Sequence, residues 1–226
     1  MFYNEEKTIS ACESDPSLIF ELLKEGHLEL LDRILSRKTF DINVCDQDGN
    51  DILTKLLKKG QFKIVLKHIK DKRWNINHQN NDGDTFSHIL VSMNNINTLD
   101  IFKTIMKIRR YNPNIKNNNG QTIFDIAIDN DSTFLASKIL EDTRFHEVGV
   151  FSFKNYYETY IKTKKYGGYT KVNNLEKILN LRSKQVSPKV NTIINYFKEN
   201  FDVIKEEVIN NKTNSMDSYL NEVLFA

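Results

Sequence analysis

Histidine and cysteine are the side chains best suited to bind a metal or to act as a base or nucleophile, so their spacing is informative first. The chain of 226 residues carries five histidines and two cysteines: His27, His68, His78, His88, His146, Cys12 and Cys45. None of them forms an H-x-x-x-H, H-E-x-x-H or C-x-x-C motif. His78 and His88 flank a turn and could meet, but we favour packing or solvated roles for both. We therefore expect no metal ligands.

Other signatures of catalysis are also absent from the sequence. Gly167-Gly168 lacks the spacing of a dinucleotide- or phosphate-binding loop, and there is no G-x-S-x-G or kinase signature. Glu206-Glu207 is interpreted as a solvated helix face rather than a catalytic pair. We expect no catalytic and no cofactor-binding residues and favour a protein that is not an enzyme, although distant residues could still assemble an active site.

The composition is that of an ordinary soluble protein, with 39% hydrophobic and 27% charged residues. The formal net charge of +2 gives no overall nucleic-acid footprint. No stretch approaches the roughly 18 apolar residues that span a membrane, and the first residues do not resemble a secretion signal. Cys12 and Cys45 are far apart, which favours buried thiols in the cytoplasm or another reducing compartment.

A repeated pattern organises the first two-thirds of the chain. Three glycines preceded by Asp or Asn, spaced 34 and then 37 residues apart, are Gly49, Gly83 and Gly120. An asparagine stands six residues before each glycine, at Asn43, Asn77 and Asn114. Asp46, Asn80 or Asn117 stands three residues before it, and an apolar segment follows it. Several offsets recurring in phase indicate repeated structural units.

Each unit is predicted to contain a tight turn, a helix of about two turns, a short break and a second helix. Asp-Gly and Asn-Gly suit turns with positive φ, and Thr85 and Thr122 are expected N-caps of the first helices. Asp15-Pro16 predicts an N-cap followed by proline at the first helical position. Helices this short are marginal alone, so they must bury their apolar faces on neighbouring units.

These residues resemble the ankyrin repeat, whose pattern is D-x-x-G-x-T-P-L-H-x-A followed by a glycine and a leucine-rich second helix. "NGQTIFDIAI" is similar to its first half and "GHLELLDRIL" to its second. The resemblance implies an all-α, ankyrin-like solenoid of helix-turn-helix repeats with β-turn fingers over residues 1–145. Its expected units are a half-capped one at 14–42 and full ones at 43–76, 77–113 and 114–145. Three departures are Ile52, Phe86 and Ile123, which replace the expected prolines.

The family implies binding of a partner protein through the turn tips and the inner face of the first helices. Carried over by position, the turn tips are Gln47, Asp48, Asn50, Asn81, Asp82, Asp84, Asn118, Asn119 and Gln121. The positions on the inner helix face are Lys58, Lys59, Met93, Asn94, Asp129 and Asn130. The alternative is that these are only solvated turn residues.

Residues 146–226 lose the repeat and are predicted to form a helical C-terminal domain or a cap on the array. Lysines interleave with tyrosines at 154–171, which could hold phosphate and stack bases, but protein contact or cap packing is favoured. The main hypothesis is a non-catalytic interaction module, and the alternative is an enzymatic or nucleic-acid-binding activity in 146–226 that the repeats target. The Asn- and Lys-rich composition resembles ankyrin proteins that viruses and intracellular bacteria deliver into host cells, which implies a host protein as partner.

Overall fold

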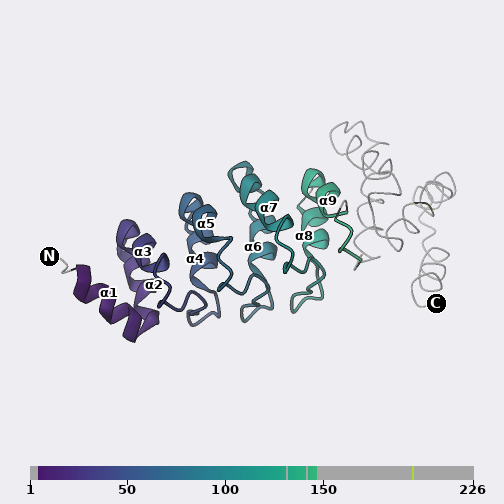
Figure 1. The fold of residues 1–226 in the computed structure, drawn as a ribbon. Helices are drawn as coiled ribbons and strands as arrows, with labels where there is room; N and C mark the ends of the chain where they lie inside the picture. The colour runs from purple at the N-terminus through teal and green to yellow at the C-terminus, as the bar shows by residue number, and fades with distance from the viewer. Residues whose placement is uncertain (1–4, 131, 141, 147–194, 196–226) are drawn as a thin grey trace. The chain divides into compact units, whose positions relative to one another are not determined.

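The structure, a computed structural model, describes residues 5–130, 132–140, 142–146 and 195 (Figure 1). The described part contains no strand, so the expectation of an all-α fold is confirmed there; only isolated bridges join Cys45 to Asp51 and Gln79 to Thr85. Its α-helices are α1 (Glu5–Ser14), α2 (Ile19–Glu25), α3 (Leu28–Leu35), α4 (Ile52–Lys58), α5 (Phe62–His68), α6 (Phe86–Ser92), α7 (Leu99–Met106), α8 (Ile123–Asp129) and α9 (Thr133–Leu140). Two 3-10 turns, η1 (Pro16–Leu18) and η2 (Ile96–Thr98), precede α2 and α7.

The chain divides into two compact units: Met1–Tyr111 with Ile115–Asn119, and Asn112–Asn114 with Gly120–Ala226. In the first unit, helix pairs follow one another: α2 contacts α3 and α4, α4 contacts α5 and α6, and α5 contacts α7. Helix α1, which the sequence pattern did not predict, packs against α3. In the second unit α8 packs against α9. Each helix therefore buries its apolar face on a neighbour rather than standing alone.

The first helix of each turn-bearing pair begins at a side chain that caps it. Thr85 and Thr122 form capping boxes with His88 and Asp125, which confirms the two predicted N-caps. Asp51 stands at the equivalent place before α4, where its carboxylate accepts the Thr54 N–H at 2.7 Å. An N-cap of this kind satisfies N–H groups that have no partner inside the helix. Asp51 therefore caps the first turn-bearing pair at the place where Thr85 and Thr122 cap the other two.

A series of buried aromatic rings follows the second helices. Phe40, Trp74, Tyr111 and Phe145 are each at most 3% exposed, and they follow the second helices α3, α5, α7 and α9. The Trp74 ring packs edge-on against Phe86, with centroids 5.1 Å apart, while its N–H donates to the Asp51 carboxylate at 2.7 Å. The same aspartate thus caps α4 and anchors the ring that begins the next turn-bearing segment, which ties local structure to core packing.

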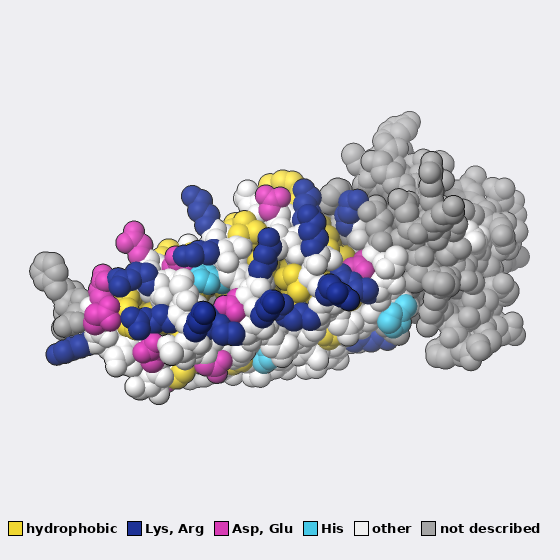
Figure 2. All heavy atoms as spheres, viewed as in Figure 1, with side chains coloured by type: hydrophobic (Ala, Val, Ile, Leu, Met, Phe, Trp, Pro, Cys, Tyr) yellow, Lys and Arg dark blue, Asp and Glu magenta, His cyan; other side chains and the backbone are white. Residues whose placement is uncertain are grey.

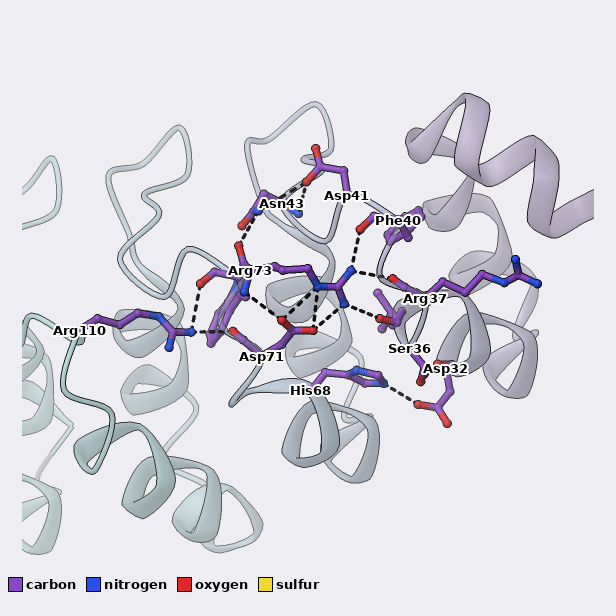
Figure 3. Close-up of polar contacts among 12 residues, drawn as sticks. Asp32, Ser36, Arg37, Phe40, Asp41, Asn43, His68, Asp71, Arg73 and Arg110 are labelled. Atoms are coloured by element: carbon purple, nitrogen blue, oxygen red, sulfur yellow. Dashed lines mark hydrogen bonds and ion pairs between the residues drawn. The ribbon is translucent and has the colours of Figure 1, made fainter.

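Arg73 joins consecutive helix pairs in the first unit through carbonyl groups (Figure 3). Its guanidinium donates to the carbonyls of Leu35 at 3.1 Å, Arg37 at 2.6 Å and Phe40 at 3.0 Å. The carbonyls at the end of α3 have no partner within that helix, and a cation is favoured at this negative end of the helix dipole. Arg110 repeats the arrangement one pair later, donating to the carbonyls of Asp71 at 2.7 Å and Trp74 at 3.2 Å.

Candidate partner-binding surface

The three turns, 46–51, 80–85 and 117–122, are closed by the side chain that stands three residues before each glycine. The Asp46 carboxylate accepts the N–H groups of Asp48 and Asn50, and the Asn80 amide oxygen accepts those of Asp82 and Asp84, all at 2.9–3.0 Å. Asn117 accepts the Asn119 N–H in the same way at 3.1 Å. Side chains of Asp and Asn commonly mimic a backbone turn in this manner. This contact explains one of the recurring sequence offsets.

Hydrogen bonds link each turn to the next within the first unit. Asn81 donates its backbone N–H to the Asp48 carbonyl and its side-chain amide to the Gln47 carbonyl, both at 3.0 Å. Asn118 does the same toward the second turn, donating to the Asp82 carbonyl at 3.0 Å and the Asn81 carbonyl at 2.9 Å. Asn81 and Asn118, which were predicted to contact a partner, therefore already serve as connectors between turns.

The asparagine six residues before each glycine fastens the chain behind its turn. The Asn43 amide donates to the Arg73 carbonyl at 2.9 Å, and the Asn77 amide donates to the Arg110 carbonyl at 2.8 Å. In the second unit the Asn114 amide donates to the Arg144 carbonyl at 2.8 Å. All three recurring asparagines thus have an intramolecular function, which leaves fewer polar side chains of the turns available to another molecule.

The turn residues predicted to bind a partner differ in their accessibility. Gln47, Asp48, Asn81, Asp82, Asn118 and Asn119 are exposed. Asn50 is only 1% exposed and bonds to the Lys58 ammonium and the Asn80 amide, so burial removes it from any contact surface. Asp84 and Gln121 are half-buried and bond to Asn117 and Asp129. The side chains of Gln47, Asp82 and Asn119 make no hydrogen bond or ion pair with the described part of the chain.

The predicted inner-face positions lie at the ends of the first helices. Lys58 ends α4 and Lys59 follows it, both exposed; Met93 and the exposed Asn94 follow α6; in the second unit Asp129 ends α8 and Asn130 follows it. Burial beside Asp125 raises the pKa of Asp129, although the Gln121 amide opposes the shift. Lys59 also lines a hollow on the surface.

This hollow lies between α2 and α4 and has a volume of about 260 Å³. Phe20 and Leu23 give it apolar walls, and its charged lining is Glu21, Lys24, Asp46, Lys55 and Lys59. Burial alone raises the pKa of Asp46, but hydrogen bonds from Lys55 and from two backbone N–H groups outweigh it and hold that pKa below its usual value. The sequence pattern did not assign the α2 residues to the surface, because no turn precedes that helix to set their register.

Three histidines of the described residues contact polar partners, among them His68, whose Nε2 lies 2.7 Å from the Asp32 carboxylate. His88 is buried within its capping box, and His78 lies 3.3 Å from the Cys45 sulfur and 2.8 Å from the Gly49 carbonyl. Burial and the nearby Asp51, Asp46 and Asp41 raise the pKa of the Cys45 thiol, which disfavours the reactive thiolate. Across the part of the chain that the structure describes, no three metal-ligating side chains cluster and no helix is both long and apolar enough to cross a bilayer.

No protein-family model, curated protein or solved structure matches this chain. The lysine- and tyrosine-rich stretch 154–171, Gly167-Gly168, Glu206-Glu207 and the alternative activity assigned to 146–226 lie outside the described residues, which reach only His146 and Asn195 of that region.

Proposed function

We propose that the chain is a non-catalytic interaction module built from ankyrin-type repeats, which binds a partner protein through its turns and the adjoining face of its first helices. The observation that supports this proposal most directly is the hydrogen-bonded series of turns. Asn81 and Asn118 hold successive turns in a fixed register, while Gln47, Asp82 and Asn119 keep their side chains unbonded to the described residues. A preorganised polar surface loses little conformational entropy on binding.

The hollow between α2 and α4 is the proposed anchoring point of this surface. Its apolar walls, Phe20 and Leu23, are rimmed by charged side chains of both signs: Glu21, Lys24, Asp46, Lys55 and Lys59. Interfaces commonly concentrate their binding energy where an apolar side chain enters such a depression surrounded by polar groups. The revised surface therefore comprises the tips Gln47, Asp48, Asp82 and Asn119 together with Lys24 and Lys59 at the hollow. The resemblance to repeat proteins of host-associated microbes extends the proposal to a host protein in a reducing compartment.

Affinity capture with the full chain, followed by mass spectrometry, tests the proposal. The proteins captured by the native chain are compared with those captured by two variants. One variant carries Ala at residues 47, 48, 82 and 119, and a second carries Lys24→Glu with Lys59→Glu. A partner captured by the native chain is expected to bind at least one of these variants with an affinity lower by about tenfold or more. Lys7→Glu with Lys38→Glu, two exposed positions outside this surface, is the matched control with the same change in net charge. Undiminished binding by both test variants contradicts the proposed surface.

A further inference from the structure

Exposed cations gather along the second helices α5 and α7 and the segments that follow them. Residues 62–73 contain five Lys and Arg and one Asp, and residues 99–110 contain four Lys and Arg and one Asp. Figure 2 shows basic side chains along the described array, the part that holds α5 and α7 included. Helices that pack against each other, as α5 and α7 do, lie about 8–10 Å apart. The two helices therefore present one continuous basic face.

Part of this positive charge is already used inside the molecule. Arg73 and Arg110 donate to carbonyl groups of neighbouring segments, Lys67 pairs with Asp32 at 2.6 Å, and Lys103 lies 3.9 Å from Asp100. Five other exposed cations have no carboxylate partner in the described part of the chain: Lys63, Lys70, Lys72, Lys107 and Arg109. We call these five residues the basic face.

The same chain shows how cations on and after α3 are paired with an acidic helix. Helix α1 packs against α3, and its Glu5 and Glu6 pair with Arg33, while Glu6 and Glu13 lie 3.4 and 3.5 Å from Arg37. Ile9 and Cys12 of α1 are buried beneath these ion pairs. An acidic amphipathic helix thus covers the cations on α3 and on the segment that follows it.

The basic face places cations near the ends of its helices. Lys70 follows the end of α5 by two residues, and Lys107 follows the end of α7 by one. Leu66 stands on α5 between Lys63 and Lys67 with 36% of its surface exposed, and so offers an apolar contact between charges. Residues at i, i+3 and i+4 share one face of a helix. Cations and an exposed leucine therefore form one stripe.

The same observations disfavour a nucleic acid as the ligand. Single-stranded nucleic acids are bound by exposed aromatic rings as well as by cations, but Phe40, Trp74 and Tyr111 are all buried. The guanidinium groups of Arg73 and Arg110, which could grip phosphate in a bidentate manner, are engaged with backbone carbonyls. The exposed carboxylate of Asp100 on α7 would also repel a phosphate backbone.

We propose that the basic face on α5 and α7 binds an acidic amphipathic helix supplied by another protein, through carboxylate–cation pairs of the kind that join α1 to α3. The carboxylates of such a helix would meet Lys63, Lys70 and Lys107, and one of its apolar residues would contact Leu66. This surface is separate from the turns and the α2–α4 hollow, so the proposal stands independently of the function proposed above.

Fluorescence anisotropy of a labelled, helix-forming Ala/Glu peptide added to the full chain tests this inference. We expect binding that weakens as salt is raised and that falls about tenfold or more in the variant carrying Lys70→Glu and Lys107→Glu. The variant carrying Lys7→Glu and Lys38→Glu, two exposed residues outside both proposed surfaces, has the same net charge as that variant and is expected to bind as the native chain does. Circular dichroism of both variants verifies that the helices are retained.

Three results would overturn the inference. Equal loss of peptide binding in the two double variants would reduce it to an effect of net charge. Tighter binding of a single-stranded RNA than of the peptide, with the same sensitivity to Lys70 and Lys107, would identify a nucleic-acid surface instead. Concentration-dependent dimerisation of the chain that Lys70→Glu and Lys107→Glu abolish would assign the basic face to α1 of a second copy.

Discussion

Individual asparagine side chains stabilise the turns through hydrogen bonds, and several of these bonds join one repeated unit to the next. Asn43 fastens the carbonyl of Arg73, and Asn80 closes its own turn and also bonds to Asn50 in the preceding one. An amide can donate and accept at the same time, which a carboxylate cannot. Asparagine therefore recurs where a side chain must bond in two directions, and this accounts for much of its abundance in the turns.

Arg73 is the residue whose loss we expect to be most damaging among the exposed or half-buried cations. Arg73→Ala removes charge-assisted hydrogen bonds to the carbonyls of Leu35, Arg37 and Phe40. Such bonds contribute about 1.5–3 kcal/mol each in favourable cases but are not additive, so we expect a loss of about 2–4 kcal/mol in the free energy of unfolding. Urea denaturation followed by circular dichroism measures it.

Arg109→Ala is the control for this prediction, because Arg109 is exposed and makes no bond to the described residues. We expect its free energy of unfolding to stay within about 0.5 kcal/mol of the native value. Similar stability of the two variants would show that the carbonyl contacts of Arg73 contribute little.

At the level of elements, the turns place backbone so close together that only glycine fits. Gly83 has φ of +75°, and a Cβ built on it would lie 2.5 Å from the Asn118 amide oxygen and 2.6 Å from the Asn118 nitrogen. Gly49 stands in the same relation to Asn81, with a closest approach of 2.6 Å. The tight approach is what allows each asparagine to bond the carbonyls of the preceding turn.

Gly83→Ala should therefore destabilise the chain more than Gly60→Ala does. Both glycines have positive φ, +75° and +73°, but a Cβ at residue 60 would meet nothing within 4 Å. The left-handed conformation alone costs an alanine about 1–2 kcal/mol, and Gly83→Ala adds a clash with backbone and side chain of Asn118. Thermal or urea unfolding of the two variants side by side isolates that clash, and equal losses would contradict the role assigned to the link between turns.

The sequence pattern was sufficient for some elements and insufficient for others. The sequence is enough to recognise the caps Thr85 and Thr122 and the turn glycines, because N-caps and positive φ require particular residue types at fixed offsets. Helix α1 has no such offset, since its place depends on ion pairs with Arg33 and Arg37 far along the chain. An aromatic residue recurs 34, 37 and 34 residues apart, at Phe40, Trp74, Tyr111 and Phe145. This spacing is visible in the sequence, although the repeat was predicted from the turn residues and the apolar segments after them.

The candidate surface was harder to predict than the fold for a related reason. Polar residues at turn tips look equivalent in sequence, but Asn50, Asn81 and Asn118 differ from Gln47 in what they already bond. The hollow between α2 and α4 and the basic face on α5 and α7 each combine residues from two helices. Their existence depends on helix packing, which no local spacing encodes.

At the scale of the whole molecule, three aspartates are paired with basic side chains, and acid should weaken all three contacts together. Asp32 joins α3 to Lys67 and His68 on α5, Asp46 joins a turn to Lys55, and Asp71 holds Arg73. Burial raises the pKa of Asp32, but hydrogen bonds from Lys67 and His68 outweigh it. Burial likewise raises the pKa of Asp46, but hydrogen bonds from Lys55 and two backbone N–H groups outweigh it, and for Asp71 the Arg73 hydrogen bond is the largest cause. All three pKa values therefore lie below their usual value.

A carboxyl group whose pKa is lower in the folded chain stabilises folding fully above its unfolded pKa, near 4. That stabilisation is lost as the pH falls through the lower, folded value, because the unfolded chain then binds protons more readily than the folded one. We expect the free energy of unfolding in urea to fall steeply below about pH 4 and to change little from these groups between pH 5 and 7. Asp71→Asn, which abolishes one of the three titrations, should lower stability near neutrality and make the acid slope shallower. An acid slope identical to that of the native chain would show that Asp71 titrates alike in the folded and unfolded states.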